Sequence, residues 1–315
     1  MHGVIRIGTR GSQLALWQAR TVATALEGVG TAAELVIIRT SGDRLQEAPL
    51  SEAGGKRLFV KEIEDALLRG DVDLAVHSAK DMPAVLPDGL EVAATLPRED
   101  PRDVIVLPHG ARGRDAAAVL AQLGPAPRIG TSSIRRVAQL ATLVPRASFA
   151  PIRGNVDTRL RKLDGGEYDA LVLAAAGLRR LGFAERISAA VAPEDCIPAP
   201  GQGVVAIEIR SSDHDTRTVL QRLHDQAAAT ALIAERTVVA ALGGGCQLPL
   251  GALAVQRGSD LELHAIVCSA DGTRAVRARE FAPSTDPAGL GSRVARRLIE
   301  QGAAAILDEV RGVDR

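Results

Sequence analysis

Aromatic residues, cysteines and net charge are all scarce in this sequence of 315 residues. Phe, Trp and Tyr make up 2% of the chain, which leaves few rings on which single-stranded bases could stack. The formal net charge is zero at pH 7, which is not typical of a general nucleic-acid or membrane-surface binder. No apolar run approaches the roughly 20 residues of a membrane span. We therefore expect a globular protein with neither nucleic-acid nor membrane partners.

The sequence has only three cysteines, Cys196, Cys246 and Cys268, which are too few and too scattered for a disulfide framework. Their number is odd, no CxxC occurs and no His stands beside them, so neither disulfides nor a zinc site is indicated, and we expect no metal. A buried thiol is the default for each, and Cys268 fits it because it ends an alternating apolar run. The first ten residues lack the apolar core of a signal peptide, which predicts a cytoplasmic protein.

The order of predicted elements indicates an α/β protein with more than one domain. A chain of this length exceeds the roughly 250 to 300 residues at which single cores usually divide. Alternating strands and helices in the first half predict parallel sheets, whereas three strand-like runs between two helices near the C-terminus predict a small α+β unit. Expected strands cover residues 4–8, 34–40, 72–78, 102–107, 128–130, 147–152, 169–173, 204–210, 250–256, 260–268 and 273–281, and expected helices include 12–27, 58–69, 227–242 and 287–301.

Two proline-bearing segments, 97–101 and 198–203, separate these units. The strand at 204–210 follows the second break and could return to either parallel sheet. Segment 41–56 is long for a strand-to-helix connection, and such loops are often mobile lids.

Three strand-to-helix junctions resemble one another and predict an anion site. They read RIGTRGS at 6–12, RIGTSSIRR at 128–136 and IRGNVDTR at 152–159, and the repeated RIGT hints at duplicated topology. Each turns on glycine and offers Ser, Thr or Asn as a helix N-cap, so free N–H groups face the end of the sheet. No phosphate-binding glycine motif occurs, so a nucleotide is not specifically indicated.

Arg135 and Arg136 stand in a first helical turn, where positive charge opposes the helix dipole. The cost reaches about 1 kcal/mol for each residue unless an anion offsets it. An anion outside the helix is therefore expected. The alternative is that these arginines pair with surface carboxylates.

The run VHSAKDMP at 76–83 ends another predicted strand. His77 lies on an apolar strand and is expected to be structural. Ser78, Lys80 and Asp81 fall at the mouth of the sheet, where a cation and an anion could bind a charged ligand while the carboxylate stabilises a developing positive charge.

Cys246 follows three consecutive glycines, which predicts an unusual environment for a thiol. Glycines remove side-chain bulk and allow positive φ, so a large group could approach the sulfur. A covalent attachment point and an ordinary buried thiol both remain open at this stage.

Six runs in order across nearly the whole chain resemble the porphobilinogen deaminase family, also called hydroxymethylbilane synthases. They are VHSAKDMP, GTSSIRR, RGNVDTRL, LAAAGLRRLG, PAPGQG and GGGCQLPLG. The resemblance implies two α/β domains like type II periplasmic binding proteins and a small α+β C-terminal domain with a three-stranded antiparallel sheet. The implied boundaries are 1–100 with 201–221 for domain 1, 101–200 for domain 2, and 222–315 for domain 3, which carries Cys246.

The resemblance also implies the chemistry. Four porphobilinogen molecules are condensed head to tail, with loss of ammonia, onto a dipyrromethane cofactor attached by a thioether to Cys246, and hydrolysis then releases hydroxymethylbilane for tetrapyrrole biosynthesis. Asp81 is implied as the catalytic carboxylate that contacts pyrrole N–H groups. The residues expected to bind cofactor and substrate, mostly through their acetate and propionate groups, are Arg10, Ser12, Ser78, Lys80, Thr131, Ser132, Ser133, Arg135, Arg136, Arg153, Arg159, Arg180 and Gln202.

Two other classes stay open on the sequence alone. A solute-binding module of two α/β lobes would have nearly the same fold, but it would have no use for Cys246 or a third domain. A cysteine hydrolase is less favoured because no His stands in an obvious base position. We expect a monomer whose partner is the small molecule porphobilinogen.

Overall fold

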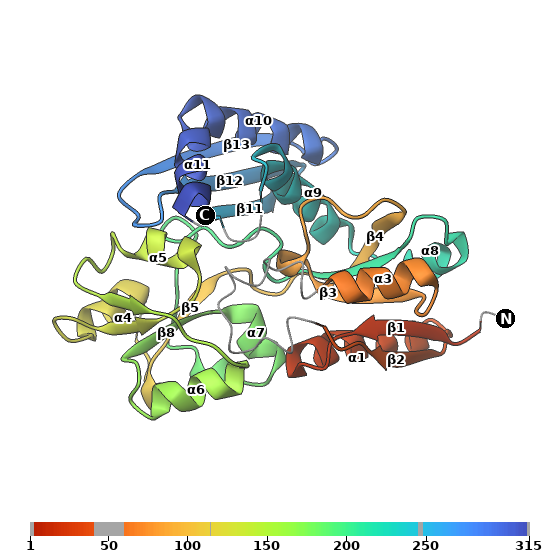
Figure 1. The fold of residues 1–315 in the computed structure, drawn as a ribbon, viewed down its shortest axis with the longest axis horizontal. Helices are drawn as coiled ribbons and strands as arrows, with labels where there is room; N and C mark the ends of the chain where they lie inside the picture. Colours follow the sequence, from red (N-terminus) through yellow and green to blue (C-terminus); the bar gives the residue numbers. More distant parts are fainter. Residues whose placement is uncertain (1–2, 41–59, 114, 245–247, 314–315) are drawn as a thin grey trace.

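The computed structural model describes residues 3–40, 60–113, 115–244 and 248–313. Two α/β units lie side by side, and the third unit packs above them in the view of Figure 1. The 41–56 segment, predicted as a lid, and Cys246 lie outside the described residues.

The first sheet has the strand order β2-β1-β3-β10-β4. Strands β1, β2 and β3 are parallel, while β10 is antiparallel to both of its neighbours. The strand that the sequence left unassigned therefore returns to the first sheet, between β3 and β4. The bounds are β1 Ile5–Thr9, β2 Ala33–Ile37, β3 Leu74–Ser78, β4 Leu90–Thr95 and β10 Val205–Arg210, with helices α1 Gln13–Gly28, α3 Lys61–Arg69 and α8 His214–Leu220.

The second sheet repeats this arrangement in the order β7-β6-β8-β5-β9. Its β6, β7 and β8 are parallel, and β5 is antiparallel to β8 and β9, as β10 is in the first sheet. The two RIGT runs end the equivalent strands β1 and β6, so the duplication is real. The bounds are β5 Asp103–Val106, β6 Arg128–Gly130, β7 Ser148–Ala150, β8 Ala170–Ala174 and β9 Ala189–Ala190, with helices α4 Ala116–Gln122, α5 Ile134–Leu140, α6 Val156–Asp164 and α7 Ala175–Arg180.

The third sheet is antiparallel, in the order β11-β12-β13. Its alternating apolar residues, such as Leu261 and Leu263, share one core with the helices that cover them. The predicted fold class, two α/β units and a small α+β unit, is confirmed. The bounds are β11 Leu250–Arg257, β12 Asp260–Cys268, β13 Ala275–Pro283, α9 Gln226–Ala241, α10 Pro287–Glu300 and α11 Ala303–Val313.

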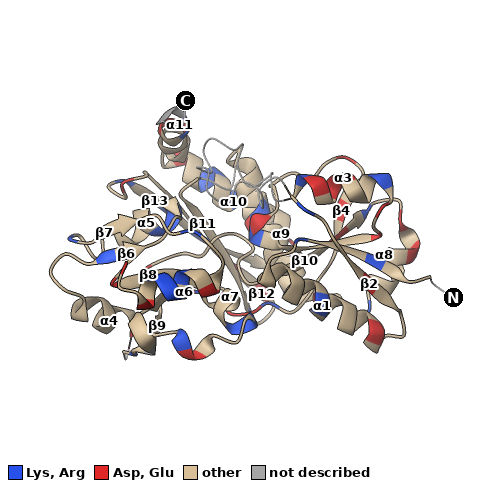
Figure 2. Cartoon of the chain, turned by 60° about the horizontal axis from the view of Figure 1, so that its bottom comes forward, with Lys and Arg blue, Asp and Glu red and all other residues tan. Residues whose placement is uncertain are grey.

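Acidic and basic residues both occur on outer helices such as α3 and α6, in keeping with the zero formal charge (Figure 2). None of the described helices is long and apolar enough to cross a membrane.

Two linkers join the α/β units where the parallel strands end. The first linker covers residues 96–102 and the second covers 191–204. They are hydrogen-bonded to each other, because the Glu99 N–H donates to the Gly203 carbonyl at 3.1 Å. Asp103 then begins β5 opposite Ala174, and Val205 begins β10 opposite Ser78. The carboxyl ends of β3 and β8 consequently both lie at the linkers.

Gly203 is required by the contact between the linkers. Its φ is +88°, and a Cβ at this position would lie 2.3 Å from the Glu99 carbonyl oxygen. We expect Gly203→Ala to lower the free energy of unfolding by at least about 1–3 kcal/mol, the usual cost of such a backbone conformation for other residues. Urea unfolding measures this loss, and Gly258→Ala, a positive-φ glycine in open space, is the matched control. Equal losses in the two variants would contradict the proposed steric cause.

The third unit is fixed to the same linkers through Glu235 of α9, which is completely buried. Its carboxylate lies 2.6 Å from Arg98 Nη1 and accepts hydrogen bonds from the N–H groups of Gly201 (2.6 Å) and Ala254 (2.8 Å). One carboxylate therefore connects both linkers with β11.

Candidate active site

The predicted catalytic segment lies directly beside the second linker. Lys80 and Asp81 belong to a short 3₁₀ helix, η2 (Ala79–Asp81), that follows β3, and both are half-buried. The Ala79 N–H donates to the Val204 carbonyl at 3.0 Å. Ser78 ends β3, and its hydroxyl accepts a hydrogen bond of 2.8 Å from Gln18. The end of β3 therefore places a carboxylate residue and a lysine beside the second linker.

His77, expected to be structural, lies in the core. Its Nε2 is 3.0 Å from Oε2 of Glu208 on the neighbouring strand β10, and both side chains are buried. The expectation is confirmed.

Serine residues cap two of the predicted junction helices. Ser12 accepts from the Ala15 N–H at the start of α1, and Ser133 accepts from the Arg136 N–H at the start of α5. Ser132 is exposed and is hydrogen-bonded with both backbone groups of Ile152, which joins the second and third junctions. Of the other residues placed here by the sequence, Arg10 is half-buried and Thr131 is 4% exposed.

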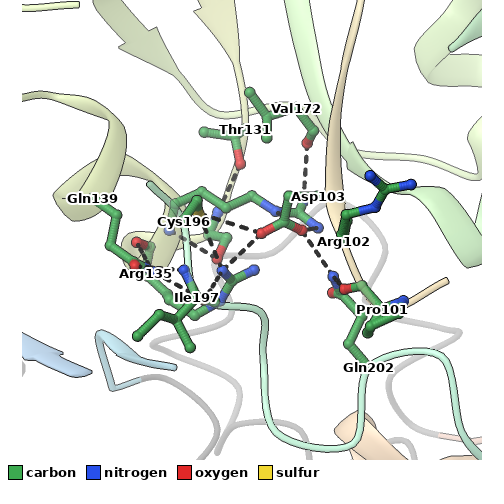
Figure 3. Close-up of polar contacts among 12 residues, drawn as sticks. Pro101, Arg102, Asp103, Thr131, Arg135, Gln139, Val172, Cys196, Ile197 and Gln202 are labelled. Carbon is green, nitrogen blue, oxygen red and sulfur yellow. Dashed lines mark hydrogen bonds and ion pairs between the residues drawn. The ribbon is translucent and has the colours of Figure 1, made fainter. Parts of the chain in front are cut away.

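Asp103 pairs with both arginines of the α5 junction. Its Oδ2 lies 2.7 Å from Arg135 Nη1, and its Oδ1 accepts from Arg136 Nε at 3.0 Å and Nη2 at 2.8 Å. The side chain of Asp103 is completely buried, and the two arginines are 5% and 8% exposed. Figure 3 shows Asp103 between Arg135 and Gln202 of the second linker, whose Nε2 donates to Oδ1 at 2.9 Å.

The charges of this cluster determine the ionisation of its members. Burial raises the pKa of the Asp103 carboxyl, but Arg135 and Arg136 lower it by more, so its pKa ends well below its usual range. Cys196 donates from Sγ to the same carboxylate at 3.4 Å, and burial raises the pKa of this thiol to about 12. The cluster thus holds an ionised carboxylate, two guanidinium groups and a neutral thiol.

The sequence predicted an anion outside the helix to offset Arg135 and Arg136. In the structure, this anion is the carboxylate of Asp103, which belongs to the chain itself. It is buried, whereas the alternative interpretation expected the arginines to pair with surface carboxylates. All three nitrogens of the Arg136 guanidinium donate to protein groups, two to Asp103 and Nη1 to the Val172 carbonyl at 2.9 Å. Arg136 is therefore part of the fold as well as a candidate ligand residue.

Arg159 and Arg180 differ from this pair because no carboxylate lies within ion-pair distance of either among the described residues. Arg159, on α6, donates to the Gly154 carbonyl at 2.8 Å. Desolvation and repulsion by Arg136 lower its pKa to about 10. Arg180, at the end of α7, donates to the Gly203 carbonyl at 2.7 Å and lies over the Trp17 ring at 5.5 Å. Desolvation lowers its pKa as well, against the attraction of Glu99.

The remaining predicted residues lie at the same edge or outside the described part. Arg153 is half-buried and follows β7, two residues before Asn155, which occupies the N-cap position of α6 without a side-chain cap bond. Cys246 is not described, but β11 just beyond it contacts the second linker, where the Ala252 N–H donates to the Pro198 carbonyl at 3.0 Å.

Comparison with known proteins decides the family. The model described as "Porphobilinogen deaminase, dipyromethane cofactor binding domain" matches residues 5–218, and "Porphobilinogen deaminase, C-terminal domain" matches 229–300. This chain belongs to the porphobilinogen deaminase family. The family predicted from the sequence is confirmed, and with it the transferase class, the role in tetrapyrrole biosynthesis and the dipyrromethane cofactor.

Relatives in this family match almost the whole chain. The chain is 47% identical over 309 residues to porphobilinogen deaminase of Syntrophobacter fumaroxidans, with 98% of each chain covered. It is 46% identical over 318 residues to the enzyme of Acidithiobacillus ferrooxidans, again with 98% of each covered. It is also 47% identical over 309 residues to the enzyme of Roseiflexus sp., with 98% of this chain and 99% of that one covered.

Solved binding-protein structures are more distant. An ancestral cationic amino acid solute binding protein is 15% identical at a TM-score of 0.41, covering 70% of this chain and 88% of that one. The periplasmic VFT2 domain of BvgS from Bordetella pertussis is 15% identical at a TM-score of 0.40, covering 70% and 86%. Similarity to solved structures at this level says nothing about the ligand or the activity of this chain.

Sequence reasoning missed Asp103, Glu235 and the position of Cys196. Asp103 lies in the expected strand 102–107, just after the predicted linker 97–101, and we predicted no partner for its side chain.

Proposed function

We propose that this chain joins four porphobilinogen molecules head to tail, with loss of ammonia, onto a dipyrromethane attached to Cys246, and releases hydroxymethylbilane by hydrolysis. The observation that carries the proposal is the excess of arginine over carboxylate at the edge of the second sheet. Among the described residues, Arg135 and Arg136 share one ion-pair partner, Asp103, and Arg159, which Arg136 repels, has no ion pair.

This charge balance suits a polycarboxylate ligand. Each porphobilinogen unit brings two carboxylates, and arginine forks bind carboxylates through paired charge-assisted hydrogen bonds. A growing chain would suffer strong mutual repulsion in a partly desolvated site unless such cations offset its charges. The binding residues we propose are the thirteen predicted from the sequence, with Arg159 and Arg180 as the strongest candidates because no carboxylate of the described chain pairs with them.

Asp81 is the proposed catalytic carboxylate. When bound, the dipyrromethane supplies the free α-carbon to which the first substrate ring is joined. Each round would break the C–N bond of the substrate's aminomethyl group and form a C–C bond to the free α-carbon of the terminal ring, whose α-proton would be lost as ammonia leaves. Asp81 would accept hydrogen bonds from pyrrole N–H groups and stabilise their positive charge, while Lys80 beside it would bind a carboxylate.

The proposal extends to the organisation of the chain. We propose three domains, 1–100 with 201–221, 101–200 and 222–315, a division supported by the separate sheets and by the gap between the two family models. We also propose a monomer in the cytoplasm with porphobilinogen as its partner.

Two arginine replacements are expected to separate ligand binding from folding. Arg159→Leu removes a desolvated cation without an acid partner, so the protein should fold as stably as wild type, while KM for porphobilinogen rises about tenfold or more through lost charge-assisted hydrogen bonds. Arg136→Leu leaves buried Asp103 with one counter-ion fewer and should cost about 3–5 kcal/mol of stability.

Thermal melting together with initial rates of ammonia release measures both effects. An Arg159→Leu protein with unchanged KM, or one that is destabilised as much as Arg136→Leu, would contradict the assignment. A protein that binds porphobilinogen without releasing ammonia would instead be a solute-binding module.

A further inference from the structure

Asp103 occupies the point where the candidate carboxylate-binding helix meets both linkers. It is the residue at which the first linker becomes β5, and its carboxylate receives Arg135 and Arg136 from α5 and Gln202 from the second linker. The side chain is completely buried, so it is not itself available to a ligand in this arrangement. Its effect on a ligand must pass through the groups it holds.

Arg135 is held by one end of its guanidinium only. Nη1 contacts Asp103 Oδ2 at 2.7 Å and donates to the Ile197 carbonyl of the second linker at 2.7 Å. Its Nε and Nη2 make no hydrogen bond to the described residues. Nη1 also donates to Cys196 Sγ at 3.4 Å. Because the guanidinium is planar and rigid, these acceptors on Nη1 fix the direction in which the remaining N–H groups point. Arg135, which is 5% exposed, thus has one nitrogen committed to the protein and two nitrogens that make no hydrogen bond to the described residues.

Gln202, in the second linker, contacts the same Asp103 carboxylate that holds Arg135. Its Nε2 donates to the Pro101 carbonyl at 2.7 Å and to Asp103 Oδ1 at 2.9 Å. If the Gln202 amide were turned over, its oxygen would face the Pro101 carbonyl and the Asp103 carboxylate, which are both acceptors. The orientation of the Gln202 amide is therefore fixed. Figure 3 shows Gln202 and Arg135 reaching Asp103 from opposite sides. The carboxylate therefore joins the two linkers to Arg135.

We propose that Asp103 is a positioning residue for substrate binding: it holds Nη1 of Arg135 so that Nε and Nη2 face the substrate carboxylates, and it ties that orientation to the two linkers. This inference rests on the proposed function, because Arg135 is taken to bind a carboxylate of porphobilinogen or of the growing chain. Groups behind a binding residue commonly fix its geometry in this way. The competing explanation is that Asp103 only stabilises the fold as a buried counter-ion.

A double-mutant cycle on KM separates the two explanations. The four proteins are wild type, Asp103→Asn, Arg135→Gln and the double variant, each isolated with its cofactor loaded and compared at one ionic strength. Asp103→Asn keeps the side-chain shape but loses the charge that anchors Nη1. We expect it to raise KM for porphobilinogen about tenfold, and we expect the double variant to match Arg135→Gln alone, because the proposed effect of Asp103 on the substrate passes through Arg135.

A matched control removes a different buried carboxylate. Glu262 on β12 is 1% exposed and lies 2.8 Å from Arg257 Nε and 2.6 Å from His264 Nε2. Glu262→Gln should lower the melting temperature while leaving KM unchanged. If Asp103→Asn does not fold, Asp103→Glu enters the same cycle, since it keeps the charge but displaces the carboxylate.

The outcomes are distinct from those that test the function. Wild-type protein without the adduct, or without ammonia release from porphobilinogen, would refute the proposed function. Wild-type protein that is active, with an Asp103 variant whose KM is unchanged or whose effect adds to that of Arg135→Gln, would leave the function standing and overturn the positioning role.

Discussion

Cys246→Ser is expected to give a folded protein that carries no dipyrromethane and forms no hydroxymethylbilane. A serine hydroxyl is a far weaker nucleophile than a thiol near neutral pH, so it should not form the linkage. Without the attached cofactor there is no primer for the first condensation. Intact-protein mass spectrometry of wild type and variant, purified from a host that makes porphobilinogen, measures the adduct directly.

Cys268→Ser is the matched control for this experiment. Cys268 ends β12, is 1% exposed, and has a pKa raised to about 11 by burial. Such a thiol is neither accessible nor ionised near neutral pH, so its replacement should leave the adduct in place. A wild-type mass equal to that of the bare chain, or an adduct that survives Cys246→Ser, would refute the attachment at Cys246.

Asp81→Asn is expected to lose several orders of magnitude in turnover while retaining the fold and at least part of the cofactor. The amide removes the negative charge that we propose stabilises cationic pyrrole intermediates. Each tenfold loss corresponds to about 1.4 kcal/mol of transition-state stabilisation. Single-turnover formation of enzyme-intermediate complexes, with adduct content checked by mass, measures the loss of the chemical step apart from loading.

Asp81→Glu tests the position of the charge. The longer side chain keeps the carboxylate but moves it, so its activity should lie between those of the Asn variant and wild type, because proton and charge transfer depend on hydrogen-bond distance. Wild-type rates in Asp81→Asn would remove this residue from the mechanism and leave it as a polar residue of η2.

The strand-to-helix junctions were predictable because local rules govern them. Ser12 and Ser133 cap their helices as predicted, and the short 3₁₀ helix that holds Asp81 follows a strand that alternation had indicated. These features depend on residues a few positions apart, which the sequence displays directly.

The partners of the arginines were not predictable in the same way. Asp103 is 33 residues from Arg136 and 99 from Gln202, and only the sheet pairing brings the three together. Helix-dipole reasoning correctly required an anion near Arg135 and Arg136, but it contains no information on where along the chain that anion resides. Strand β4 was also missed, although β10, with which it pairs across more than a hundred residues, was predicted.

The position of β10 has a consequence for the order in which the chain can fold. Residues 205–210 lie between β3 and β4, so the first sheet lacks a central strand until two thirds of the chain has left the ribosome. The second sheet draws all its strands from residues 103–190 and can close earlier. Domains usually fold as units during synthesis. Here the lobe that is made first has to wait for the lobe that is made second, and its unpaired strand edges stay exposed meanwhile.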